Sequence, residues 1–305
     1  MKKLLSIIFT TILVTTLAAC GADSTNGSGG SKGKITVGGK DFTEQHIISK
    51  MTSLYLKEKG YDVEEASGMG STVVRKALEN GQVDLYWEYT GTALVVYLKQ
   101  DVVTDPEKAY ETVKEIDRKK GLIWLNKSDV NNTYAVLMRK DLANELGITS
   151  LEDLANYVNK DSSKLKFASN AEFFSRNDGL IGLQKKYGFK FPKKNIVKMD
   201  NGLVLNALKE KQVQVSMGTV TDGRNKGFNL VVLKDNKQFF PPYNLAPVIN
   251  QKVLEKNPEL KGLLNKMGEK LNEATMTELN YRVDVKHEDV NKVAREWLTK
   301  NGFIK

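Results

Sequence analysis

The amino-acid sequence predicts an α/β fold arranged as two lobes. Short apolar segments that suit β-strands alternate with amphipathic helical segments, which is typical of layered α/β proteins. This alternation runs twice, with a break near Asn131, and so indicates two lobes. The 305 residues suffice for one large domain or two ordinary ones, and 40% hydrophobic with 27% charged residues is the composition of a soluble globular protein.

Residues 1–19 have the pattern of a secretory signal peptide. Lys2 and Lys3 give a positive start, and the apolar stretch that follows is too short to span a bilayer comfortably. It ends in Leu17-Ala18-Ala19-Cys20, which resembles the bacterial lipoprotein box and implies that the Cys20 thiol is lipidated. The alternative is a chance cysteine behind an ordinary signal peptide. Lipid on Cys20 would anchor the protein to the outer face of the cell membrane.

Residues 20–33 are rich in glycine and serine and predict a flexible tether. Because Cys20 is the only cysteine of the chain, we expect no disulfide in the folded body.

The first run of elements follows the tether. Its expected strands are Lys34–Gly38, Tyr61–Ala66 and Val83–Tyr86. Between the first two strands, apolar residues recur at helical spacing: Ile47, Ile48, Met51, Leu54 and Tyr55. Asp41 and Glu44, three residues apart, predict a capping box at the start of this helix, and Ser71 or Thr72 is expected to cap the next one.

The second run repeats this rhythm. Its expected strands are Thr133–Met138, Leu165–Ala168, Ile196–Met199, Val213–Met217, Leu230–Leu233 and Asn244–Ile249. Helices are expected up to Tyr157, at Gly179–Tyr187 and Leu203–Lys209, and from about Lys252 onward. Thr149 with Glu152 and Ser150 with Asp153 are both spaced for a capping box at the start of the helix that runs to Tyr157.

Residue types that serve catalysis are sparse in this chain. His46 and His287 are the two histidines, and neither has the spacing of a metal ligand. No nucleophile elbow, phosphate-binding loop or spare cysteine is present, so we expect no enzyme, no cofactor and no metal. Carboxylates brought together from distant positions remain an open route to catalysis. The net charge of +9 comes from scattered lysines, so no nucleic-acid partner is expected.

Several short blocks carry a resemblance to a known family. They are Gly38–Gln45 (GGKDFTEQ), Asp84–Thr92 (DLYWEYTGT), Asn132–Ala135 (NTYA), Arg176–Gly179 (RNDG), Thr221–Arg224 (TDGR) and Phe240–Val248 (FPPYNLAPV). In this order they resemble the glycine betaine/carnitine/choline-binding proteins of ABC transporters, from about Lys34 to the C-terminus. The EYTGT part is quite specific, and the combination of blocks is more specific still.

The resemblance implies the fold of type II periplasmic binding proteins, in which two α/β lobes are joined by two crossover strands and the ligand lies between them. Lobe I would contain residues 34–132 and 238–305, and lobe II residues 133–237, with crossings near Asn132 and Gln238. It also implies a membrane permease and a separate ATPase subunit as partners, and a monomeric protein.

The resemblance also implies which residues bind the ligand. A quaternary ammonium has no N–H, so aromatic faces hold its charge, at roughly 0.5–2 kcal/mol per ring. By the match to the family's motifs, Tyr89, Tyr134 and Tyr243 would form this cage. The ligand's carboxylate would be held by Arg176 through two parallel donors, by Lys40 as a point charge and by the Thr92 hydroxyl. The alternative roles are ordinary core tyrosines and surface ion pairs.

Two positions depart from the family's pattern. Thr219 stands where many members have an aromatic residue, which would leave one side of the cage open or polar. This would admit a bulkier ligand such as carnitine, or lower the affinity for simple choline. Trp87 stands where the family often has proline. In a strand it would share a face with Tyr89, so it could supplement the cage, although packing against the other lobe is the favoured interpretation.

The function that the resemblance implies is capture of a quaternary-ammonium osmoprotectant by the extracellular substrate-binding subunit of an ABC importer. The alternatives are the same fold binding another solute such as an amino acid, a secreted two-lobe enzyme, and an envelope lipoprotein or adhesin without a small ligand.

Overall fold

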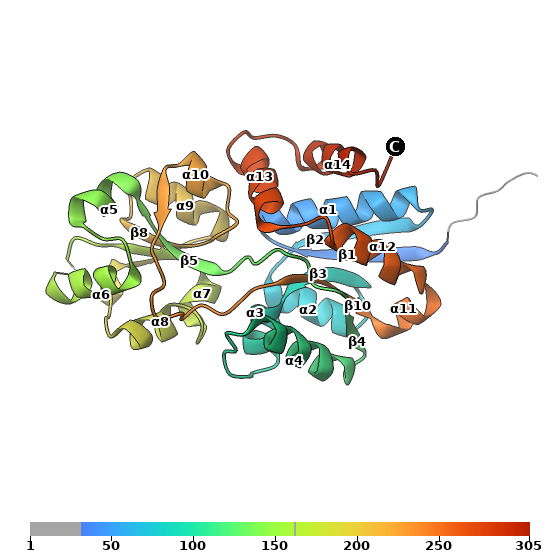
Figure 1. Cartoon of the computed structure of the whole chain (residues 1–305), viewed down its shortest axis with the longest axis horizontal. Coiled ribbons are helices and arrows are strands. Elements are labelled where there is room, and N and C mark those ends of the chain that lie inside the picture. The colour runs from blue at the N-terminus through green and yellow to red at the C-terminus, as the bar shows by residue number, and fades with distance from the viewer. Residues whose placement is uncertain (1–31, 162) are drawn as a thin grey trace, which may run out of the picture. The chain divides into compact units, whose positions relative to one another are not determined.

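Two mixed β-sheets of five strands each organise the described part of the chain, residues 32–161 and 163–305 of a computed structural model (Figure 1). The first sheet has the strand order β2-β1-β3-β10-β4, and the second has the order β7-β6-β8-β5-β9. The predicted signal peptide, the lipidation site at Cys20 and most of the predicted tether lie outside the described residues.

Every predicted strand overlaps a strand of the structure, and β4 was not predicted. The first sheet consists of β1 (Lys34–Lys40), β2 (Asp62–Met69), β3 (Leu85–Tyr89), β4 (Leu122–Trp124) and β10 (Leu245–Asn250). The second sheet consists of β5 (Tyr134–Arg139), β6 (Phe167–Ser169), β7 (Ile196–Lys198), β8 (Val215–Thr219) and β9 (Leu230–Val232).

Helices fill the connections between these strands. Those up to the second sheet are α1 (Thr43–Glu58), α2 (Ser71–Glu79), α3 (Thr90–Thr92), the π-helix η1 (Ala93–Tyr97) and α4 (Pro106–Arg118). Those within the second half are α5 (Lys140–Leu146), α6 (Leu151–Lys160), α7 (Ala171–Ser175), α8 (Leu180–Tyr187), the 3₁₀ turn η2 (Lys193–Asn195), α9 (Asn201–Lys209) and α10 (Arg224–Gly227). The C-terminal region is helical as predicted, with α11 (Gln251–Lys256), α12 (Glu259–Gly268), α13 (Glu273–Asp284) and α14 (Val290–Lys300).

The predicted helix caps have mixed outcomes. Ser150 and Asp153 form the predicted capping box of α6. The capping box predicted for α1 is wrong: Phe42 is the N-cap residue, without a side-chain cap, and the Glu44 carboxylate bonds elsewhere. The cap predicted for α2 is also wrong, because Gly70 is the N-cap residue and the Ser71 hydroxyl donates to Glu172 instead.

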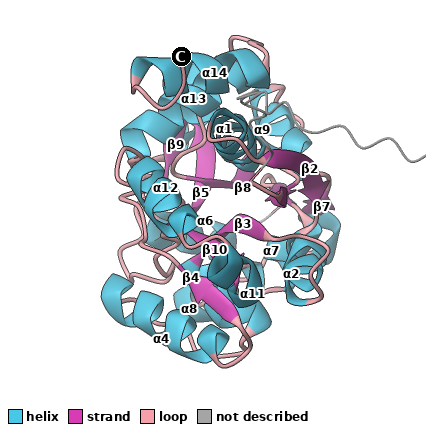
Figure 2. Cartoon of the chain, turned by 90° about the vertical axis from the view of Figure 1, so that its right-hand side faces the viewer, coloured by secondary structure: helices cyan, strands magenta, loops and turns pink. Residues whose placement is uncertain are grey.

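Strand β3 shows how the first sheet is covered on both faces. Successive side chains of a strand point to opposite faces. Leu85 packs into a cluster with Leu56 of α1, whereas Tyr86 packs into another with Val74 of α2. Helices α1 and α2 therefore cover opposite faces of this sheet (Figure 2).

Trp87 follows the same alternation and faces α1. It is fully buried, its indole N–H donates to Thr52 Oγ1 at 2.9 Å, and its ring lies against Gly268 of α12. Since α1 and α12 both cover the first sheet, the predicted packing of Trp87 against the other lobe is wrong.

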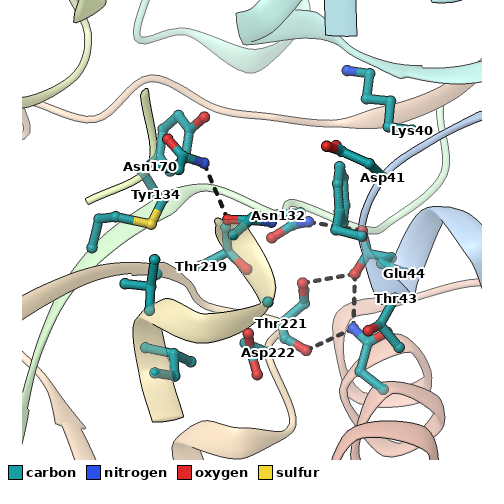
Figure 3. A pocket seen from close by; sticks show the side chains of 18 of the residues that line it. Lys40, Asp41, Thr43, Glu44, Asn132, Tyr134, Asn170, Thr219, Thr221 and Asp222 are labelled. Carbon is teal, nitrogen blue, oxygen red and sulfur yellow. Dashed lines mark hydrogen bonds between the residues drawn. The ribbon is translucent and has the colours of Figure 1, made fainter. Parts of the chain in front are cut away.

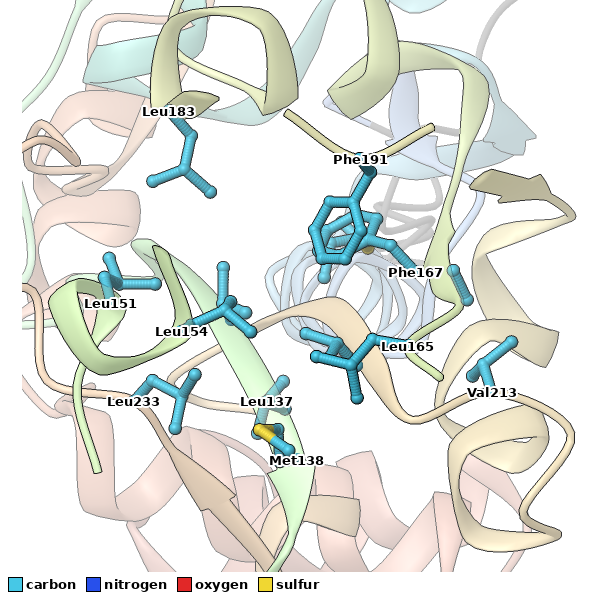
Figure 4. Packing of buried hydrophobic residues seen from close by; sticks show 14 of the residues in the cluster. Leu137, Met138, Leu151, Leu154, Leu165, Phe167, Leu183, Phe191, Val213 and Leu233 are labelled. Atoms are coloured by element: carbon cyan, nitrogen blue, oxygen red, sulfur yellow. The ribbon is translucent and has the colours of Figure 1, made fainter. Parts of the chain in front are cut away.

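The second sheet has a separate hydrophobic core (Figure 4). Strand β6 contributes Phe167, and helices α6 and α8 contribute Leu154 and Leu183. The rings of Phe167 and Phe191 lie 5.3 Å apart. No helix among the described residues has both the length and the apolar character needed to cross a bilayer.

The two sheets share one topology. In spatial order, the first three strands of each sheet are parallel, and the fourth is antiparallel to the third and to the fifth. Strand β3 thus corresponds to β8, and each follows a nine-residue helix, α2 or α9. Their last residues, Tyr89 and Thr219, occupy equivalent positions.

The chain passes from the first sheet to the second between β4 and β5 and returns between β9 and β10. The predicted crossings near Asn132 and Gln238 fall in these two connections. The boundaries of lobes I and II at single residues stay a prediction.

Candidate ligand-binding site

A pocket of about 200 Å³ lies where strands of both sheets end (Figure 3). Lys40 ends β1, Tyr89 ends β3, Thr219 ends β8 and Tyr134 begins β5, and all four line the pocket. Parallel strands bring their carboxyl ends together at one edge of a sheet, where ligands of α/β proteins commonly bind. The pocket is small beside the roughly 300–1,000 Å³ of sites for drug-sized molecules, so it suits a small ligand.

Four aromatic side chains line this pocket. Tyr89, Tyr134 and Tyr243 were predicted, and the sequence analysis missed Phe42. The rings of Tyr134 and Tyr243 lie 5.1 Å apart at 74°, and those of Phe42 and Tyr89 lie 6.1 Å apart. Burial raises the pKa of Tyr89, Tyr134 and Tyr243, so their hydroxyls are neutral at physiological pH.

Protein cations already lie over one face of each cage tyrosine. Lys40 Nζ is 4.9 Å from the ring centroid of Tyr89, and the Arg176 guanidinium is 5.3 Å and 5.5 Å from those of Tyr134 and Tyr243. These contacts occupy part of each ring's surface. A ligand would use the faces and edges that remain open to the pocket.

Lys40 forms a buried ion pair at the pocket wall. Its Nζ lies 2.5 Å from Glu88 Oε1, and Glu88 also accepts from the Tyr86 hydroxyl at 2.6 Å and the Tyr89 amide at 2.6 Å. An ammonium group has three donors, so the bond to Glu88 leaves two of them for other acceptors.

Arg176 lies behind the pocket instead of lining it. It lines a second pocket that shares Ser71 and Glu172 with the first. Its donors reach both oxygens of Asp178, Glu172 at 2.7 Å, Thr92 Oγ1 at 3.3 Å and the Tyr243 hydroxyl at 3.0 Å. These bonds use all five N–H groups of the guanidinium. A direct grip on a ligand carboxylate would require one of them to be released.

Thr92 and Thr219 both line the pocket as predicted. Thr219 pairs directly with Tyr134 across strands β8 and β5. Trp87 does not line the pocket, so the prediction that it could supplement the cage is wrong.

The sequence analysis did not identify Glu44 as a pocket residue. Glu44 lies in the first turn of α1, and its carboxylate accepts four hydrogen bonds. These come from the Tyr89 hydroxyl at 2.8 Å, Asn132 Nδ2 at 2.9 Å, the Thr221 hydroxyl at 2.7 Å and Asn280 Nδ2 at 3.1 Å. Burial raises the pKa of Glu44, although these hydrogen bonds favour the ionised form.

Among residues 32–161 and 163–305, no group of three or more His, Cys, Asp or Glu side chains could hold a metal ion. The arrangement of the pocket is that of a binding site: it combines aromatic faces, four threonines, both cationic and acidic side chains, and the buried carboxylate of Glu44.

Comparison with known proteins identifies the family. Residues 33–300 match the model of the substrate binding domain of ABC-type glycine betaine transport systems. The chain is 43% identical over 275 residues to a glycine-betaine-binding protein of Pseudomonas aeruginosa, with 88% of each chain covered. It is 35% identical over 309 residues to the carnitine transport binding protein OpuCC of Listeria monocytogenes, covering 100% of this chain and 99% of that one.

Solved structures agree with this assignment. The structure of a glycine betaine/carnitine/choline ABC transporter protein superposes with a TM-score of 0.72 and 32% identity, covering 89% of this chain and 100% of that chain. The predicted two-lobed fold of type II periplasmic binding proteins is thereby confirmed. The chain belongs to the family of extracytoplasmic substrate-binding domains of ABC-type glycine betaine transport systems.

Proposed function

We propose that this protein captures a small quaternary-ammonium osmoprotectant such as glycine betaine, carnitine or choline and presents it to a membrane permease driven by a separate ATPase. The observation that carries the proposal is the gathering of Tyr89, Tyr134 and Tyr243 around one small pocket. The names of the relatives above support the same ligand class.

The aromatic wall suits a trimethylammonium group because hydrogen-bond donors are absent from that group and its charge is diffuse. Each favourable ring contributes roughly 0.5–2 kcal/mol. Phe42 adds a fourth ring beside Tyr89. Phe42 precedes α1, whereas Tyr134 begins β5 of the second sheet, so the aromatic rings come from both halves of the chain.

The ligand's carboxylate would lie against Lys40 and Thr92. Lys40 has donors left after its bond to Glu88. Thr92 Oγ1 accepts from Arg176, so its own hydroxyl hydrogen is available for another acceptor. In this arrangement Arg176 is a positioning residue, because it holds Thr92 and Tyr243 and has no donor left for the ligand.

Further parts of the proposal concern the cell. Lipid on Cys20 would hold the protein at the outer face of the membrane, the Gly/Ser-rich segment 20–33 would give the folded body reach, and the protein would act as a monomer without catalysis of its own.

A thermal-shift titration of the purified protein tests the ligand class. Glycine betaine, carnitine, choline, proline and histidine are compared, and a ligand at a hundredfold excess over Kd should stabilise the fold by about 2.7 kcal/mol. We expect the trimethylammonium compounds alone to raise the melting temperature. The Tyr134→Leu variant should lose most of this rise, whereas Tyr157→Leu, in a helix outside the pocket, should keep it. A shift with proline or histidine only would refute the proposed ligand class and retain the fold.

A further inference from the structure

Glu44 differs from the other buried carboxylates of the described chain. Four acidic side chains there are buried, and three of them have a cationic partner: Glu88 with Lys40, Asp117 with Arg75 and Asp178 with Arg176. Glu44 is 2% exposed, and no Lys or Arg of the described chain forms an ion pair with it.

The four groups that bond Glu44 are all neutral. Tyr89, Asn132, Thr221 and Asn280 satisfy its lone pairs but bring no opposite charge. Burying a carboxylate without a counter-charge is costly even when it is hydrogen-bonded. Because Glu44 lines the pocket, a cation that occupies the pocket can approach its carboxylate.

Two further acceptors near Glu44 are unpaired. Asn132 and Asn280 donate to Glu44 through Nδ2, and their Oδ1 atoms are buried without a hydrogen-bond partner. Both residues line the pocket. The Glu44 carboxylate and the two amide oxygens together make the potential beside Glu44 negative. This potential favours a positively charged ligand over a neutral one of the same shape.

We propose that Glu44 is the counter-ion of the ligand's cationic group and a specificity-determining residue that makes the pocket select positive charge as well as shape. The proposal rests on the function proposed above and deepens it. The aromatic rings recognise the methyl surface and the diffuse charge, whereas Glu44 adds a full opposite charge at the hydroxyl of Tyr89.

Pairs of ligands that differ only in charge test this role. Glycine betaine is compared with 3,3-dimethylbutanoate, and choline with 3,3-dimethylbutan-1-ol, because a tert-butyl group copies the shape of trimethylammonium without its charge. Isothermal titration calorimetry gives the ratio of the two Kd values in each pair. The variant Glu44→Gln removes the charge and keeps the size, and a rotated Asn132 amide can accept from the new N–H group.

Asp41→Asn is the matched control, because Asp41 is an exposed carboxylate that lines the same pocket. The charge-selection ratio is the Kd of the neutral analogue divided by the Kd of the cationic ligand. We expect Glu44→Gln to lower this ratio by on the order of tenfold or more, and Asp41→Asn to change it by less than about twofold. The unliganded melting temperature of Glu44→Gln should not fall, since an uncompensated buried charge is removed.

An unchanged ratio in a folded Glu44→Gln variant overturns the proposal, and so does an equal change in Asp41→Asn. A lower melting temperature with an intact ratio would show a purely structural role and also overturns it. If Glu44→Gln does not fold, Glu44→Met fills the same volume without charge and gives the same readout. Failure of the wild-type protein to bind any trimethylammonium compound would refute the proposed function itself. This outcome is distinct from failure of the Glu44 role, because it is observed in the wild-type protein alone.

Discussion

Arg176 and Thr92 illustrate how one residue acts through another at this site. The guanidinium of Arg176 is paired with Asp178 and Glu172 and also donates to Thr92 and Tyr243. Because Thr92 Oγ1 accepts this bond, its own hydrogen can point toward an acceptor in the pocket. We therefore expect the lysine and the threonine, and not the arginine, to contact the ligand's carboxylate.

Replacing Thr92 with valine removes that donor and keeps the volume of the side chain. We expect glycine betaine and carnitine to bind at least about tenfold more weakly, since a hydrogen bond to a charged group contributes roughly 1.5–3 kcal/mol. Choline has no carboxylate and should lose less. Calorimetric titration measures the three Kd values, with Thr112→Val on an exposed part of α4 as the control. An equal loss for all three ligands would contradict a carboxylate-binding role for Thr92.

At this scale the sequence motifs located most of the site. Lys40, Tyr89, Thr92, Tyr134, Thr219 and Tyr243 all line the pocket. Glu44 was missed because its spacing from Asp41 also fits a capping box, and its partner Asn280 lies 236 positions away in the chain. No local pattern joins residues so far apart, so only the folded arrangement shows that they meet.

At the scale of elements, the correspondence between β3 and β8 explains the unusual Thr219. The helices α2 and α9 and the strands that follow them have equal lengths in the two sheets, yet the sequence showed no clear repeat. Packing constrains only which positions are apolar, so equivalent elements can diverge at their exposed and pocket-lining residues. Tyr89 and Thr219 are one such diverged pair, so the end of β8 lacks the ring that the end of β3 places in the pocket.

Thr219→Tyr restores a ring at this equivalent position. Thr219 is directly opposite Tyr134, and opposed residues of antiparallel strands project from the same face. We expect choline and glycine betaine to gain up to about tenfold in affinity from one more ring, and the bulkier carnitine to lose affinity. Competition binding measures the ratio, with Thr219→Val as the control for the lost hydroxyl. A similar gain for carnitine would show that Thr219 does not set the size of the pocket.

At the scale of the whole folded body, the pocket connects elements of both sheets. Glu44 accepts from Tyr89 at the end of β3 and from Thr221 just after β8, and Ser71 of α2 donates to Glu172 of α7 at 2.9 Å. A ligand beside Glu44 would thus be held by both halves at once. Contacts of this kind slow the release of a ligand more than they speed its entry, because they form after encounter.

Thr221→Val removes the one donor to Glu44 that the second sheet supplies through a side chain. We expect ligand dissociation to become several-fold faster in stopped-flow measurements, with a much smaller change in the association rate. Thr43→Val is the matched control, because the Thr43 hydroxyl also bonds a pocket carboxylate, that of Asp284. Here both residues belong to helices, α1 and α13, that share a hydrophobic cluster with Tyr89 of the first sheet. Combined with Glu44→Met, which has no side-chain oxygen to accept from the Thr221 hydroxyl, the Thr221 change should add little, since both substitutions remove the same bond. Additive effects of the two substitutions would contradict this role, and so would an equal increase of the dissociation rate in Thr43→Val. Either result would mean that the Glu44–Thr221 bond has no part in retaining the ligand.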